Sequence, residues 1–126
     1  MSESISELQL AQNLVGEGMY CSPIGMAWTA VIHKLAEVRA RFLLPDDLVR
    51  NGINICDRSS QSKIYELLAK TLGVEADGIG LEIEHLLEQQ IQADETAYLP
   101  SREYAQEALK RARLIIEKLE EMHQLV

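Results

Sequence analysis

Two glutamate–histidine pairs have the spacing with which helices present metal ligands. Glu82 precedes His85 by three residues, and Glu120 precedes His123 by the same interval. Residues i and i+3 share a helix face, so each pair could place a carboxylate beside an imidazole, as in di-iron helical bundles. Such a centre also needs a carboxylate from each of two further helices, and Glu37 is the one candidate on a long helix. We therefore predict solvent-facing pairs with no metal or cofactor, and keep a di-metal oxidase as a competing hypothesis.

Nucleophilic catalysis would need a thiol or hydroxyl beside a histidine and an acid that orients it. The sequence offers only three candidate residues for such a site: Cys21, Cys56 and His33. His33 falls outside the apolar seam of its helix, which predicts a surface or rim histidine. The two cysteines have no metal-binding spacing, and we expect them to be buried or half-buried packing residues. The sequence therefore predicts no catalytic residue.

Acidic residues are concentrated in one segment of this chain, whose formal net charge is −8. Between Lys70 and Arg102 there is no basic residue, while the segment contains seven carboxylates: Glu75, Asp77, Glu82, Glu84, Glu88, Asp94 and Glu95. The negative potential of such a segment would attract a basic surface. We predict that Glu84, Glu88 and Glu95 form a docking surface for a basic protein partner. An acidic helix face that only keeps the protein in solution is the alternative.

The first half of the chain is locally neutral to slightly basic. Arg39, Arg41, Arg50 and Arg58 are the residues that could face RNA, if any do. The overall negative charge, however, argues against broad binding of nucleic acid or of anionic membranes.

Composition predicts a single domain over residues 1–126, with 47% hydrophobic residues and a core that needs no metal or disulfide. No apolar run approaches the roughly 20 residues of a membrane span. The first ten residues are acidic and lack the features of a signal peptide. We expect a cytoplasmic protein whose cysteines remain thiols.

Hydrophobic periodicity and end signals predict five helices, over residues 4–16, 22–42, 61–72, 79–97 and 101–123. The predicted start signals are a capping box at Ser4 and Glu7, Ser22 before Pro23, Ser59 or Ser60, and Ser101. Glycine at position 73 is the expected stop of the third helix. We predict no regular structure for residues 43–60. Pro45 can open a short helix, but Asn51 and Gly52 would break it. Ile53 and Ile55 look like a buried connector.

The second and last helices share an apolar spacing that averages 3.5 residues, which is typical of paired helices. The apolar positions expected to face the core are Ile24, Trp28, Val31, Leu35, Val38 and Phe42 in one helix and Ala105, Leu109, Ala112, Ile116 and Leu119 in the other. The third and fourth helices should bury Ile64, Leu67, Leu68, Leu72, Ile83, Leu86, Leu87 and Ile91. We predict an all-α, up-and-down bundle of four to five helices, centred on Trp28 and the turn 116–119. Surplus apolar residues, Ile32 and Leu114, further predict a homodimer.

Two stretches resemble the HEPN superfamily of small helical proteins, which pair with nucleotidyltransferases or act as ribonucleases. The first is Gly18-Met19-Tyr20 with Ala27, Ala30 and Leu35 in the helix that follows; the second is Tyr98-Leu99-Pro100-Ser101 with Tyr104, Ala105, Ala108, Leu109 and Ala112. Together they cover about a third of the chain. The resemblance implies a helical fold and, for active members, RNA cleavage by an Arg followed four to six residues later by a His.

Arg50-Asn51 looks like the start of that motif, but no His follows it within the required distance. A general acid or base for the neutral range is therefore missing where the resemblance requires one. We predict a non-catalytic binding or regulatory module that acts through protein–protein association. An HEPN-type ribonuclease or a nucleotidyltransferase partner is the alternative.

Overall fold

A computed structural model describes residues 3–75, 78–95 and 99–125 of the chain. Every regular element in these residues is helical: α1 (Glu3–Gly16), α2 (Cys21–Phe42), α3 (Pro45–Arg50), the 3-10 turn η1 (Arg58–Ser60), α4 (Gln61–Leu72), α5 (Ile79–Asp94) and α6 (Arg102–His123). The fold class is all-α, as the sequence predicts, and the described residues form six α-helices where four or five are expected. The additional one is α3, in the segment that the sequence leaves without regular structure.

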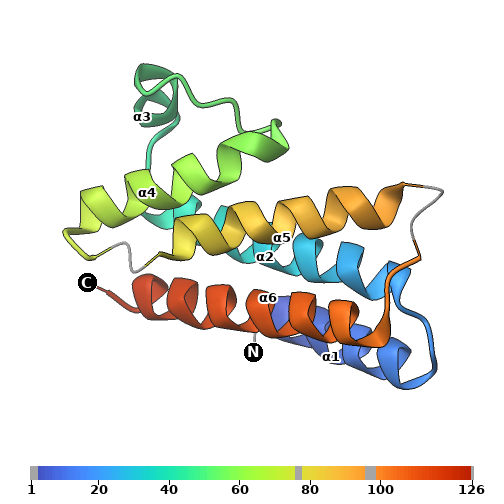
Figure 1. Ribbon diagram of the computed structural model, residues 1–126. Helices are drawn as coiled ribbons and strands as arrows, with labels where there is room; N and C mark the ends of the chain where they lie inside the picture. Colours follow the sequence, from blue (N-terminus) through green and yellow to red (C-terminus); the bar gives the residue numbers. More distant parts are fainter. Residues whose placement is uncertain (1–2, 76–77, 96–98, 126) are drawn as a thin grey trace.

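The helices α2 and α6 pack against each other, and each of them also packs against α1 and α5 (Figure 1). In this view α1 and α5 run from left to right, and α2 and α6 run from right to left, while α4 lies above α5. The central helix is α2, which packs against α1, α4, α5 and α6. Because α2 and α4 run in the same general direction, the segment between them must carry the chain back across the molecule.

The parallel arrangement of α2 and α6 is also visible in their side-chain contacts. Lys34 binds Glu120, Glu37 faces His123, and Arg41 reaches the carbonyl of Leu125. These contacts advance together along both helices, so the two helices run in the same direction. Their extensive packing is favoured by small residues that are completely buried and allow two backbones to approach: Ala27, Ala30, Ala105, Ala108 and Ala112.

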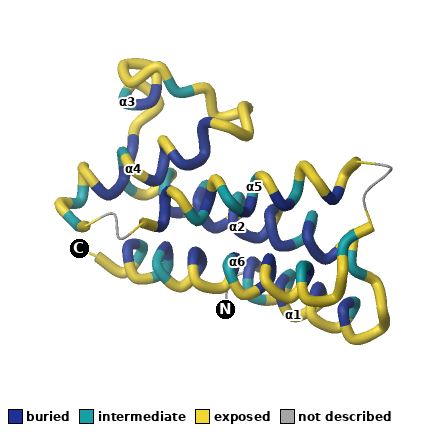
Figure 2. Tube along the Cα trace, viewed as in Figure 1, coloured by how far each residue is buried: buried dark blue, intermediate teal, exposed yellow. Residues whose placement is uncertain are grey.

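The buried face of each helix points toward a common core (Figure 2). Trp28, Ile116 and Leu119 belong to that core cluster, and Trp28 is only 7% exposed. All the core positions predicted for α6 are buried, and in α2 only Phe42, at the end of the helix, is half-buried. Helical periodicity therefore identified most of the core correctly.

Several predicted core positions in the other elements are wrong or only partly correct. Ile91 on α5 is 40% exposed and Ile55 is 46% exposed, whereas Ile53 is half-buried. Leu67, Leu72 and Leu87 are half-buried at the edge of the core. Ile91 continues the apolar spacing of its helix, but no neighbouring helix covers that position.

Helix ends that depend on local contacts agree with the sequence prediction. The Ser101 hydroxyl accepts a hydrogen bond from the Tyr104 amide at 3.1 Å, as expected of an N-cap. Gly73 ends α4 with φ 69°, a left-handed conformation that glycine adopts without strain. Ser60 occupies the N-cap position of α4 without capping it through its side chain, while Asp57 caps the preceding turn by accepting from the Ser59 amide.

Two predicted start signals are wrong. Ser4 lies inside α1 and is 1% exposed, and its hydroxyl donates to the Ala30 carbonyl of α2 at 2.8 Å. Ser22 also lies inside its helix, because α2 begins at Cys21. The hydroxyl of Ser4 thus stabilises a contact between helices and does not cap its own helix. The predicted end of the fourth helix at residue 97 lies outside the described residues, and α5 ends at Asp94.

Candidate functional site

The outward side of α5 alternates acidic and apolar residues. Leu81, Glu84, Glu88, Ile91 and Glu95 follow one another at intervals of three and four, so they occupy one face of the helix and its C-cap. All five are exposed, and Leu81 and Ile91 are 55% and 40% exposed. We call these residues the α5 stripe. It combines the three predicted partner-binding glutamates with two large apolar side chains.

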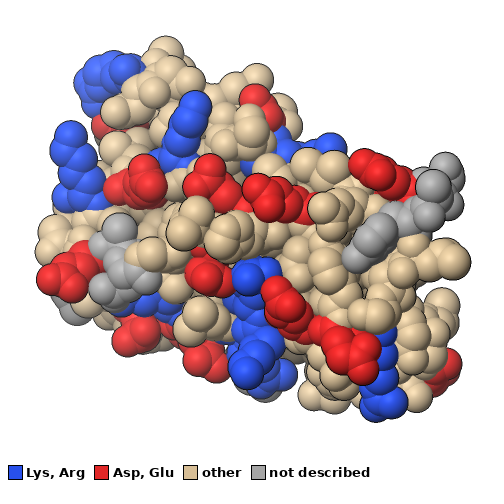
Figure 3. All heavy atoms as spheres, viewed as in Figure 1, with Lys and Arg blue, Asp and Glu red and all other residues tan. Residues whose placement is uncertain are grey.

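Other acidic residues of the same segment are held by basic residues from neighbouring elements. Glu82 accepts a hydrogen bond from Arg111 of α6 at 2.7 Å, and Asp94 lies 3.9 Å from Arg58. Asp77 lies outside the described residues. On the face seen in Figure 3, acidic side chains form a row across the middle, and further acidic side chains lie among the basic ones below it. Within this segment, Glu84, Glu88 and Glu95 of the α5 stripe are therefore exposed, whereas Glu82 and Asp94 lie beside arginines of other elements.

The four arginines proposed to face RNA are not brought together. Arg41 contacts Leu125 near the chain end, whereas Arg58 donates to Gln90 of α5 at 2.6 Å. The two arginines therefore pair with different parts of the chain, the residues after α6 and the helix α5. Arg39 is half-buried in the last turn of α2. The set therefore does not form one basic surface of the kind that binds a nucleic acid backbone.

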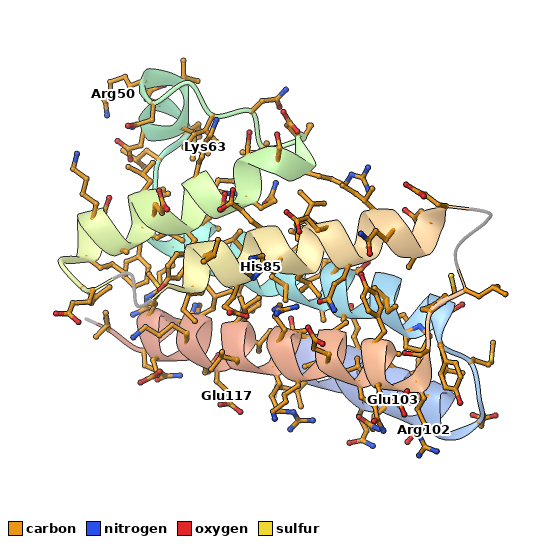
Figure 4. All side chains as sticks on the ribbon, viewed as in Figure 1. Arg50, Lys63, His85, Arg102, Glu103 and Glu117 are labelled. Carbon is orange, nitrogen blue, oxygen red and sulfur yellow. The ribbon has the colours of Figure 1, made fainter. Side chains whose placement is uncertain are left out.

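Arg50 and Asn51, the start of the possible HEPN motif, make local contacts that close α3. Arg50 donates to the Asp47 carboxylate at 2.6 Å, and the Asn51 amide donates to the Asp47 carbonyl at 2.7 Å. Asp47 also accepts from the Leu44 amide, and this backbone bond, together with the Arg50 contact, holds the pKa of Asp47 below its ordinary value. Figure 4 shows Arg50 at the α3 end of the molecule, away from His85 on α5.

The two glutamate–histidine pairs do not form a metal centre. Each glutamate instead holds a basic residue of another helix: Glu82 binds Arg111, and Glu120 binds Lys34. Both glutamates and both histidines are half-buried, so the two pairs lie at the edge of the core, where they remain partly open to solvent. Within the described ranges, no group of three or more His, Cys, Asp or Glu side chains has a geometry that could hold a metal ion.

Lys34 is buried between α2 and α6, with 2% of its side chain exposed. Its ammonium group binds Glu120 and lies 3.5 Å from the Glu37 carboxylate. The hydrogen bond from Lys34, followed by one from Gln124, holds the pKa of Glu120 below its ordinary value. Lys34 and Glu120 border a cavity of about 550 Å³ that is also lined by Ile5, Ile116 and His123.

The sequence prediction missed Lys34 as a structural residue because it interrupts an apolar run. A signal was present: Ala27, Val31, Lys34 and Val38 are spaced by four, three and four, so Lys34 occupies a seam position. A lysine at such a position must be paired when the seam is buried.

A second polar network, which is partly buried, links α5 to α6. Arg111 donates to Glu82 at 2.7 Å and to the Gln89 amide oxygen at 2.6 Å, and Glu107 lies 3.3 Å from the same guanidinium. Gln89 is 5% exposed. Glu82 and Gln89 lie two turns apart on α5, so one arginine fixes the register of the two helices. The sequence patterns described above predict no role for Arg111 or Gln89.

Cys21, Cys56 and His33 do not combine into a catalytic group. Both cysteines are exposed, so the prediction of packing residues is wrong, and the Cys21 thiol donates to the Ala93 carbonyl at 2.9 Å. His33 is exposed, as predicted, and lies 2.6 Å from the Glu7 carboxylate. Along α2, His33 is separated from Cys21 by about 18 Å of helix rise.

Comparisons with family models, with curated proteins and with solved structures find no match to this chain. The HEPN resemblance therefore stays a prediction, and Tyr98, one of its residues, lies outside the described part of the chain. Among the described helices, none is both long enough and apolar enough to span a membrane.

Proposed function

We propose that this protein is a non-catalytic helical module that acts by binding another protein through the α5 stripe. In this proposal α1, α2, α5 and α6 form an up-and-down bundle that holds α5 rigidly, with α4 beside it. The partner segment is a basic amphipathic helix. Because both thiols are exposed, we further propose the reducing cytoplasm as the working compartment.

The observation that carries this proposal is the composition of the α5 stripe. Glu84 and Glu88 are separated by four residues, a spacing at which like charges are mildly unfavourable for the helix itself. Leu81 and Ile91 flank them, and both expose large apolar side chains. Leu81 and Ile91 are ten residues apart, with the carboxylates between them. A partner helix that alternates leucine and lysine on one face would match this pattern.

Charge complementarity would mainly increase the association rate, and apolar contact would supply specificity and lifetime. Glu95 lies at the C-cap of α5 and extends the acidic part of the stripe by one turn. A basic helix of about four turns would therefore span the stripe from Leu81 to Glu95.

The experiment uses a synthetic amphipathic peptide with lysines and leucines on one face, and measures its binding by fluorescence anisotropy. The test variant carries Glu84→Lys, Glu88→Lys and Glu95→Lys. We expect at least about tenfold weaker binding by this variant, and a steep loss of wild-type affinity between low salt and about 0.3 M salt.

The matched control carries Glu17→Lys, Asp46→Lys and Glu121→Lys, three exposed acidic residues outside the stripe. It changes the net charge by the same amount, so general attraction between an acidic protein and a cationic peptide weakens equally in both variants. Equal affinities of the two variants would contradict the proposal and leave solubility as the role of the acidic segment. A separate variant with Leu81→Ser and Ile91→Ser should lose the binding that remains at high salt.

A further inference from the structure

A second exposed row of side chains runs along the outer side of α6. It consists of Gln106, Lys110, Arg113, Leu114 and Glu117: Arg113 and Leu114 are adjacent, and Lys110 and Glu117 lie about one turn before and after them. We call it the α6 ridge. Leu114 is 50% exposed and is the one large apolar residue of α6 that the structure exposes. Figure 4 shows Glu117 projecting from α6 on the side away from α5.

Shallow grooves accompany the α6 ridge on both sides. One groove, of about 380 Å³, lies between α5 and α6 and is bordered by Glu82, Lys110 and Leu114. The other, of about 160 Å³, lies between α1 and α6 and is bordered by Gln12 and Arg113, among others. A ridge with a groove on each side is the surface that a second helix fits by packing ridges into grooves.

The charges of the α6 ridge are complementary to themselves in one orientation only. Lys110 and Glu117 are equally distant from the midpoint between Arg113 and Leu114. In an antiparallel pair of α6 helices, each Lys110 therefore faces Glu117 of the second copy, and Arg113 lies one turn from that same carboxylate. A parallel pair would instead place lysine against lysine and glutamate against glutamate, which is repulsive.

We propose that a second copy of this chain docks on the α6 ridge, with the two α6 helices antiparallel and Leu114 of each copy at the two-fold axis. Such an isologous contact uses the same patch twice, and the mixed charge of the ridge suits it better than a uniformly basic or acidic partner. The inference does not depend on the proposed function, because the α5 stripe lies on a different helix.

The first test measures the molar mass by light scattering over a range of concentrations. The wild-type chain is expected at about twice the monomer mass, and Lys110→Glu or Glu117→Lys alone should weaken the dimer at least about tenfold. The double variant, which exchanges the two charges, should restore dimerisation, because each new glutamate again faces a lysine. Lys63→Glu and Glu66→Lys, both at exposed positions of α4, are the matched controls and should leave the mass unchanged.

The second test fixes the orientation. In a background with Cys21→Ser and Cys56→Ser, Leu114→Cys should form a disulfide-linked dimer, while Glu103→Cys should not. The reason is that two copies of residue 103 lie far apart in an antiparallel pair and close together in a parallel one. Any one of four results would overturn the proposal. The wild-type protein could be monomeric, or the single charge changes could leave the dimer as strong as before. The charge exchange could fail to restore the dimer, or a disulfide could form through residue 103. The peptide-binding assay of the α5 stripe is read separately, so either idea can fail alone.

Discussion

Lys34 of α2 and Glu120 of α6 form an ion pair across the parallel helix pair, although only 2% of the Lys34 side chain is exposed. Glu120 is 46% exposed and thus lies at the edge of the core. The cation is therefore the deeply buried partner, and the carboxylate is the partner that water can reach. Because burial penalises an uncompensated charge, the two residues are not equivalent in their effect on stability.

Removing the carboxylate should cost more than removing the ammonium group. Glu120→Gln leaves Lys34 buried with only the more distant Glu37, and we expect a loss of about 2 kcal/mol in the free energy of unfolding. Lys34→Met retains the apolar volume and leaves Glu120 hydrated, so we expect about 1 kcal/mol or less. Urea denaturation of both variants measures the order of the two effects. The reverse order would show that Lys34 is hydrated in solution.

The same pair makes stability depend on acidic pH. The Lys34 hydrogen bond lowers the pKa of folded Glu120 below its ordinary value of 4.5. The stability that this carboxylate contributes is therefore present above that value and is lost as pH falls through the folded pKa. Lys34→Met should therefore flatten the decline of stability between about pH 5 and pH 3. Asp47 and Asp57, whose pKa values are also lowered, are unchanged in this variant and serve as a common background. Identical pH profiles of the two proteins would argue against the pair.

Trp28 should be a major contributor to the core. It is 7% exposed and lies in the same cluster as Ile116 and Leu119. We expect Trp28→Ala to reduce the free energy of unfolding by about 3 to 5 kcal/mol. Circular dichroism is the appropriate probe, because the substitution removes the single tryptophan. A loss below about 1 kcal/mol would mean that the indole is not packed as described.

Two apolar residues of α5 should differ in their effect because only one is covered. Leu86 is fully buried, and Leu86→Ala should cost about 2 to 5 kcal/mol. Ile91 is 40% exposed, and Ile91→Ala should cost less than about 1 kcal/mol. Chemical denaturation compares the two variants directly. Equal losses would indicate that Ile91 becomes buried in solution, as contact with a second molecule would produce.

The purified protein should not degrade RNA. Arg50 is 71% exposed and pairs with Asp47 in its own short helix, so Arg50→Ala should change stability by less than about 1 kcal/mol. A gel assay with single-stranded RNA tests for cleavage. Degradation by the wild-type chain that disappears in Arg50→Ala would favour the HEPN-type ribonuclease over the binding module.

Much of the fold can be predicted from the sequence because many of its signals are local. The cap at Ser101 and the stop at Gly73 depend on hydrogen bonds within a few residues, and both predictions are correct. The predicted cap at Ser4 is wrong because its hydroxyl donates to the carbonyl of Ala30, a residue 26 positions away. The predicted burial of Ile91 is wrong because periodicity identifies the face of a helix but cannot show whether a neighbouring helix covers that face.

The candidate site divides in the same way. The sequence alone determined that the chain is helical and that Glu84, Glu88 and Glu95 share a segment without basic residues, because composition and spacing are properties of the chain itself. Only the tertiary structure decided that Glu82 turns to Arg111, that Arg58 reaches Gln90, and that Lys34 is buried against Glu120. These partners come from helices that are distant in sequence, and the burial and pairing of a charge depend on what packs around it.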